Sequence, residues 1–137
     1  MIGILIVAHG RLGQAFLETA EMIVGRCENV RTCAFTQGTD VEELRKMLKV
    51  AIREVDEGQG VIILTDMFGG TPSNISLSFL EDGQLEVVTG VNLPMLLTAL
   101  TKRSGTTLKD LAGRLKTSGC NNIYIASDVL ATKLGGR

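Results

Sequence analysis

The only histidine of the chain, His9, stands where an uninterrupted apolar run, residues 2–8 (IGILIVA), comes to an end. Such a run is typical of a buried strand in a parallel sheet. The residue that ends it lies at the carboxyl edge of the sheet, where open α/β folds bind ligands and place catalytic groups. An imidazole, with an ordinary pKa of about 6.5, suits proton or group transfer near neutral pH. His9 is therefore a candidate functional residue, with a plain loop cap as the alternative.

A second apolar run, residues 61–65 (VIILT), ends in Asp66. If both runs are strands of one parallel sheet, His9 and Asp66 meet at the same edge. A carboxylate that accepts the proton of one imidazole nitrogen fixes the tautomer and leaves the lone pair of the other nitrogen free, as in a catalytic triad. The sequence has no Gly-x-Ser-x-Gly nucleophile elbow. His9 itself is therefore the predicted nucleophile.

Asp66 opens a glycine-rich turn, residues 66–74 (DMFGGTPSN), that predicts an anion site. Pro72 suits the first position of a helix with Thr71 as its N-cap. The N–H groups of Ser73 and Asn74 would then have no partner inside the helix and could bind a negative group. An ordinary turn with an N-cap explains this motif equally well in isolation. Beside a nucleophilic histidine, however, a phosphoryl group is the expected electrophile. The predicted phosphate-binding residues are Gly69, Gly70, Thr71 and Ser73.

Strands and helices alternate along the chain, which predicts a doubly wound α/β fold with a mainly parallel β-sheet flanked by helices. The 137 residues suit a single domain, 1–137. Asp40 and Glu43 match a capping box at the start of the second helix. Strands are expected at residues 2–8, 30–35, 61–65, 85–89 and 123–126, and helices are expected to begin near residues 12, 41, 72, 93 and 107.

Composition excludes several classes of function. The 14 basic and 15 acidic residues are interspersed, without the basic stripe that nucleic-acid binding needs. No apolar stretch approaches the roughly 20 residues of a membrane span, and the N-terminus lacks the basic region of a signal peptide. A cytoplasmic protein without direct membrane insertion is expected. Cys27, Cys33 and Cys120 form no C-x-x-C pair and are interpreted as small apolar residues in a reducing compartment. With one histidine, neither a metal site nor a cofactor is predicted.

Three motifs together resemble a known family. They are His9-Gly10 at the end of the first strand, residues 66–74, and residues 90–95 (GVNLPM). Their order and spacing are similar, over nearly the whole chain, to the enzyme IIA domain of the mannose class of bacterial sugar phosphotransferase systems. The resemblance implies that His9 accepts phosphate from the phosphocarrier HPr and passes it to a histidine of enzyme IIB during sugar uptake. It also implies that Asp66 orients His9 and that Thr71, where the family has Ser or Thr, bonds the phosphoryl oxygens.

The resemblance further implies a homodimer in which the last strand, residues 123–126, is exchanged. The residues favour pairing as well, because this short apolar strand would make a poorly protected sheet edge. The family often continues into a IIB domain through an Ala/Pro-rich linker. No such linker is found here, and a stand-alone subunit is expected.

Other functions stay open at this point. Cobalt and iron chelatases of tetrapyrrole synthesis also have His-Gly after the first strand, but they usually supply a second histidine. Histidine phosphatases use Arg-His-Gly, and Ala8 stands at the arginine position. A regulatory domain whose phosphorylated His9 reports sugar status to a partner would use the same site as a transport subunit.

Overall fold

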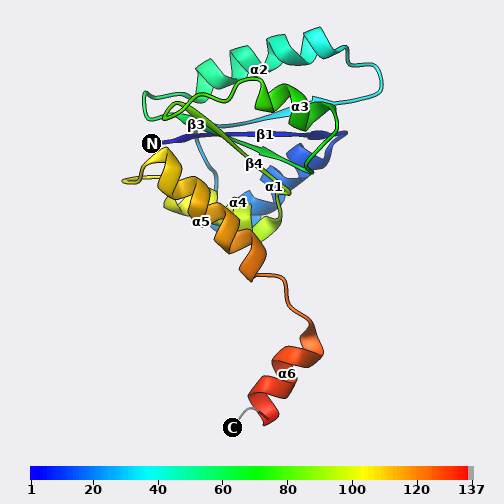
Figure 1. The fold of residues 1–137 in the computed structure, drawn as a ribbon, viewed down its shortest axis with the longest axis vertical. Coiled ribbons are helices and arrows are strands. Elements are labelled where there is room, and N and C mark those ends of the chain that lie inside the picture. Colours follow the sequence, from blue (N-terminus) through cyan, green and yellow to red (C-terminus); the bar gives the residue numbers. More distant parts are fainter. Residues whose placement is uncertain (136–137) are drawn as a thin grey trace.

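Four parallel strands form the centre of the protein in the computed structural model, which describes residues 1–135. Their order across the sheet is β2-β1-β3-β4 (Figure 1). Because β1 pairs with β2 on one side and with β3 on the other, the strand order reverses between β1 and β3. The carboxyl ends of these two strands are therefore the switch point at which doubly wound sheets bind ligands. The predicted fold class is confirmed, with strands β1 (Gly3–His9), β2 (Val30–Phe35), β3 (Val61–Thr65) and β4 (Leu85–Thr89).

Helices cover both faces of the sheet (Figure 1). The helix between β2 and β3 and the short helix after β3 lie on one face, and three helices lie on the other. The first group is α2 (Val41–Val55) and α3 (Thr71–Leu77), and the second is α1 (Leu12–Val24), α4 (Leu93–Lys102) and α5 (Leu108–Asn121).

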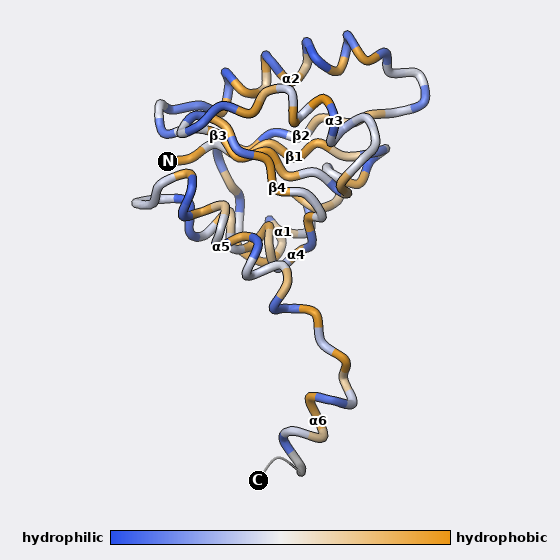
Figure 2. The backbone as a smooth tube through the Cα atoms, in the orientation of Figure 1, coloured by the Kyte–Doolittle hydropathy of each residue, from blue (hydrophilic) through white to orange (hydrophobic). Residues whose placement is uncertain are grey.

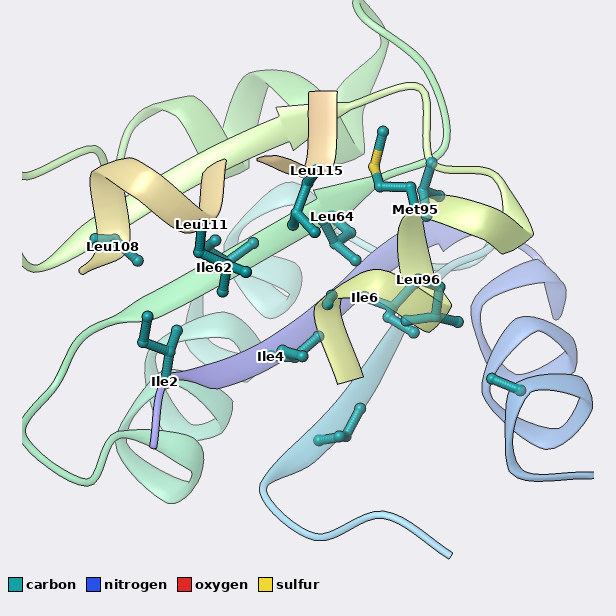
Figure 3. Close-up of a cluster of buried hydrophobic side chains, with 14 residues drawn as sticks. Ile2, Ile4, Ile6, Ile62, Leu64, Met95, Leu96, Leu108, Leu111 and Leu115 are labelled. Carbon is teal, nitrogen blue, oxygen red and sulfur yellow. The ribbon is translucent and has the colours of Figure 1, made fainter. Parts of the chain in front are cut away.

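Side chains that alternate along β1 and β3 build two separate cores. Ile6 and Leu64 point toward α4 and α5 in a cluster of fully buried aliphatic side chains (Figure 3). Leu5 and Ile63 point the other way, toward α2. Burying a side chain of this size stabilises the fold by about 1.5–3 kcal/mol. The two central strands are therefore clamped from both faces, and the residues that follow them have fixed positions.

Helix starts agree only in part with the prediction. Asn92 and Thr107 each cap a helix through a side-chain oxygen that accepts a backbone N–H. Asp40 occupies the N-cap of α2 but makes no side-chain capping bond, so the predicted capping box is wrong. Instead, Thr36 and Thr39 bond to each other in the loop ahead of Asp40 and form the turn that leads into α2.

The predicted strand at residues 123–126 does not form in the single chain, where Ala126 already belongs to a helix; its exchange between two chains stays a prediction. Residues 123–125 are extended without strand pairing, and α6 (Ala126–Gly135) follows and points away from the sheet (Figures 1 and 2). Ile123, Tyr124 and Ile125 have the composition of a strand, but they are 75%, 70% and 66% exposed, because nothing in the described chain pairs with them. Residues 136–137 lie outside the described residues. A single domain over 1–137 stays a prediction.

Within residues 1–135, none of the helices combines the length and the apolar character that a membrane crossing requires.

Candidate functional site

His9 and Asp66 meet at the switch point of the sheet, as the two apolar runs predicted. His9 is the last residue of β1, and Asp66 follows β3 directly. The Oδ2 atom of Asp66 accepts two hydrogen bonds from His9, one from Nδ1 at 2.8 Å and one from the backbone N–H at 2.9 Å. The Oδ1 atom accepts the Met67 N–H at 3.0 Å. Both carboxylate oxygens are therefore held, and the imidazole is attached to a fixed acceptor.

The electrostatics of this pair favour an ionised carboxylate on Asp66. Burial acts to raise the pKa of Asp66, but hydrogen bonds from the His9 backbone and imidazole, and the charge of that ring, bring the pKa below its ordinary value. An ionised Asp66 makes Nδ1 the hydrogen-bond donor, so in the neutral form of the imidazole the lone pair lies on Nε2. The His9 side chain is 45% exposed, whereas the Asp66 side chain is 10% exposed. The arrangement thus presents a free ring nitrogen to solvent.

Gly70 brings backbone close to that free nitrogen. Its φ of +84° and the φ of +87° at Gly69 are in the region that favours glycine. A methyl group placed on Gly70 would lie 3.4 Å from Cε1 of His9 and 3.7 Å from Nε2. Only a residue without a side chain leaves this approach to Nε2 open. The Gly70 backbone therefore lies beside the ring nitrogen that an electrophile would approach, and the phosphate contacts of Gly69 and Gly70 stay predictions.

The start of α3 differs from the prediction by one residue. Gly70 is the N-cap and Thr71 is the first helical residue. Asn74 donates its N–H to the Gly70 carbonyl at 3.0 Å, so this N–H is not available for an anion. Ser73 is fully buried, and its hydroxyl has no partner among the described residues. Its predicted phosphate contact stays a prediction, and Thr71 is partly exposed beside the turn.

Sequence reasoning missed the apolar surroundings of the site. Leu12, Met67 and Phe68 are 44%, 52% and 75% exposed, on the segments that directly follow β1 and β3. It also missed Phe35, whose ring stands perpendicular to the His9 imidazole. The only signal for Phe35 is that it ends a predicted strand, and its contact with His9 depends on the register between β1 and β2.

No cluster of three or more His, Cys, Asp or Glu side chains that could hold a metal ion occurs among the described residues. The three cysteines are free thiols. Burial raises the pKa of Cys33 to about 11, which leaves this thiol protonated at neutral pH. The chemistry of the site therefore rests on His9, Asp66 and the turn after β3.

Comparison with known proteins agrees with this geometry. A family model described as "PTS system fructose IIA component", of the mannose-type enzyme IIA, matches residues 3–116. The chain belongs to this family. It is 35% identical to the fructose-specific EIIA component of Bacillus subtilis, over 95% of this chain and 90% of that protein. It is 37% identical to the mannose-specific EIIAB component of Escherichia coli K12, over 74% of this chain but only 32% of that longer protein.

A solved structure of an EIIA component from Streptococcus agalactiae superposes with a TM-score of 0.85 at 32% identity, over 93% of this chain and 99% of that chain. As an enzyme IIA component of the mannose/fructose class, the protein is a phosphotransferase subunit of a sugar phosphotransferase system. This membership decides against the chelatase alternative.

Proposed function

We propose that His9 accepts a phosphoryl group from the phosphocarrier HPr in the cytoplasm and passes it to a histidine of an enzyme IIB partner. The observation that carries this proposal is the bond of 2.8 Å between His9 Nδ1 and Asp66 Oδ2. Because Asp66 occupies Nδ1, the exposed Nε2 atom keeps its lone pair for an incoming electrophile.

In the forward step, the Nε2 lone pair attacks the phosphorus of the donor phosphohistidine. The new Nε2–P bond forms as the donor N–P bond breaks, and that electron pair returns to the donor nitrogen. Nδ1 keeps its proton, so the phosphorylated ring of His9 is cationic. The carboxylate of Asp66 stabilises this cation across the same hydrogen bond. The second step repeats the exchange with the enzyme IIB histidine as the nucleophile.

The phosphoryl oxygens are assigned to Gly69, Gly70 and Thr71. Two observations support this part of the proposal. The Gly70 backbone lies against the Cε1 and Nε2 edge of the imidazole, and the N–H of Thr71 precedes the first hydrogen bond of α3. Thr71 offers a hydroxyl on the same turn. Because transferred phosphoryl groups carry several negatively charged oxygens, such donors stabilise the transition state by positioning and charge.

Proteins, and not small molecules, are the proposed donor and acceptor. His9 is almost half exposed. The apolar side chains of Leu12, at the start of α1, and of Met67 and Phe68, in the turn after β3, are exposed on the segments that follow the two central strands. Exposed apolar residues that gather beside a reactive group are typical of a protein-docking face. Two histidines on separate proteins can approach each other only at an open surface of this kind.

The proposal is tested by incubating the protein with enzyme I, HPr and labelled phosphoenolpyruvate. We expect one acid-labile, base-stable label per chain in the wild type and none in His9→Gln, whose melting temperature should match the wild type. Asn74→Gln serves as a control, because Asn74 is exposed on α3 and its backbone is already paired. An unlabelled wild type, or an undiminished label in His9→Gln, would refute the proposal.

We also propose that the protein is a homodimer in which residues 123–125 of each chain form a strand that pairs with the partner chain. Support comes from the exposure of Ile123, Tyr124 and Ile125 and from β4, which ends the described sheet with an open edge. Strand exchange across a two-fold axis is a low-cost route to such a dimer.

Sedimentation at micromolar concentration should give about twice the chain mass of 14.7 kDa. Ile125→Asp should yield a monomer, because a charge cannot be buried unpaired in an apolar pairing surface. Thr132→Asp, an exposed change on α6, should leave the dimer intact. A wild type that sediments as a monomer would contradict the dimer without affecting the chemistry of His9.

A further inference from the structure

We propose that Phe35 is a positioning residue for phosphoryl transfer, which holds the His9 imidazole in the orientation that Asp66 alone does not fix. The inference rests on the proposed function of His9. Phe35 ends β2 directly opposite His9 in the register of the two strands. The two rings stand at 88° to each other, with their centroids 6.0 Å apart. This is the edge-to-face arrangement that aromatic pairs prefer.

The imidazole needs a second constraint because it has two free torsions. The bond from Nδ1 to Asp66 Oδ2 fixes one end of the ring. The outer torsion of histidine has a broad, roughly two-fold preference, so one hydrogen bond leaves the ring free to tilt about that contact. A tilt swings Nε2 away from the line of attack on phosphorus. The perpendicular ring of Phe35 blocks this motion from the side of β2.

Phe35 is itself anchored well enough to act as a stop. Its carbonyl accepts the Gly10 N–H at 2.8 Å, which fixes the backbone that immediately follows His9. Its half-buried ring packs on the core cluster between the sheet and α2, where Leu44 and Leu48 are fully buried. The orientation of the reactive ring is therefore set by the hydrophobic core through Phe35 and by charge through Asp66.

Three variants test this role. Phe35→Leu keeps the apolar volume and removes the aromatic contact, and Phe35→Tyr restores the ring. Phe79→Leu is the matched control, because Phe79 is half-buried on the same cluster. The aromatic contact corresponds to a loss of about twofold to tenfold in rate. We expect Phe35→Leu to show this loss in kcat at saturating phospho-HPr, with KM unchanged. Phe35→Tyr should recover the rate, and Phe79→Leu should transfer like the wild type even if it melts earlier.

A second readout does not need the phosphoryl donor. In ¹⁵N spectra of the single histidine, the wild type, Phe35→Tyr and Phe79→Leu should hold one tautomer, protonated at Nδ1. Phe35→Leu should keep this tautomer, because the bond to Asp66 remains, but its imidazole should show a lower order parameter in relaxation measurements. Equal order parameters and equal kcat in Phe35→Leu and Phe79→Leu would overturn the inference. If the wild type stays unlabelled but Phe35→Leu still has the more mobile imidazole, phosphoryl transfer is refuted and Phe35 is retained as the residue that orients the ring.

Discussion

The two ends of the sheet use charge in opposite ways. At the amino end, Arg103 is 4% exposed and donates to the carbonyls of Ile2, Asn29 and Glu28. At the carboxyl end, His9 is exposed and bonds to a single side chain, Asp66, through one ring nitrogen. The guanidinium is enclosed by backbone acceptors, whereas the imidazole keeps a reactive atom free.

This difference separates stability from reactivity. A buried cation costs several kcal/mol of desolvation, which is offset only where hydrogen bonds satisfy its donors. Arg103 meets that condition through its two terminal nitrogens, which tie the start of β1 to the loop before β2, whereas its buried Nε has no partner among the described residues. His9 and Asp66 also form a linked pair, but their bond selects a tautomer and leaves Nε2 available. Substitutions at the amino end should therefore lower stability, and substitutions at the carboxyl end should lower rate.

The largest expected effect is at Asp66. Asp66→Asn keeps the shape but removes the charge and favours the wrong tautomer of His9, a change that costs about 10⁴-fold in a protease triad. We expect a smaller loss of transfer rate here, about 10²-fold, because the phosphohistidine donor is already reactive. Asp40→Asn is the control, because Asp40 is an exposed carboxylate at the same edge of the sheet. Single-turnover transfer from phospho-HPr measures the effect, and a wild-type rate in Asp66→Asn would exclude an orienting role.

Arg103→Met should be the next largest change, and it should appear in stability. Removing the guanidinium leaves buried carbonyl groups without a hydrogen-bond donor, so the free energy of unfolding should fall by about 2–4 kcal/mol. Lys102→Met, an exposed cation at the end of α4, should change it by less than about 0.5 kcal/mol. Urea unfolding measures both variants. Phosphoryl transfer at low temperature should be normal in both variants. An Arg103→Met variant that unfolds like the wild type but transfers phosphate slowly would contradict the assignment of stability to the amino end of the sheet and of reactivity to the carboxyl end.

Thr71→Val separates phosphate binding from helix capping. Because Gly70 is the N-cap of α3 and Thr71 makes no capping bond, stability should change little. Losing a hydrogen bond to a charged phosphoryl group should slow transfer by an amount that corresponds to about 1–3 kcal/mol. Thr117→Val, on the exposed face of α5, controls for the loss of a hydroxyl. Normal transfer together with a lowered melting temperature would assign Thr71 to the helix instead.

The smallest predicted effect is a pH dependence of stability. The pKa of Asp66 is lower in the folded chain than its ordinary value, so its stabilising contribution is present above about pH 4 and is lost as the pH falls through the folded pKa. The difference in unfolding free energy between wild type and Asp66→Asn should therefore shrink below about pH 4. Urea titrations at several pH values measure it, and a difference that grows toward acid would contradict the assigned direction.

The site was predictable from sequence to the extent that it depends on local pattern. Buried parallel strands are uninterrupted apolar runs, so β1 and β3 could be recognised from the sequence. Their carboxyl ends then place His9 and Asp66 at the same edge of the sheet. The start of α3 was misplaced by one residue because Gly70, and not Thr71, is the N-cap, and both residue types are accepted at that position. The strand at 123–126 does not form in the single chain, because strand pairing needs a partner that local composition does not supply. The contact with Phe35 required the register between two strands.

The most direct test of the central claim is the position of the phosphoryl group on the single histidine. With ¹⁵N-labelled imidazole and phospho-HPr as donor, ³¹P and ¹⁵N spectra distinguish the two ring nitrogens. We predict phosphorus bonded to Nε2, with Nδ1 still protonated and bonded to Asp66. Phosphorus on Nδ1, or a label that leaves both imidazole nitrogens unchanged, would contradict the claim that Asp66 reserves Nε2 of His9 for phosphoryl transfer.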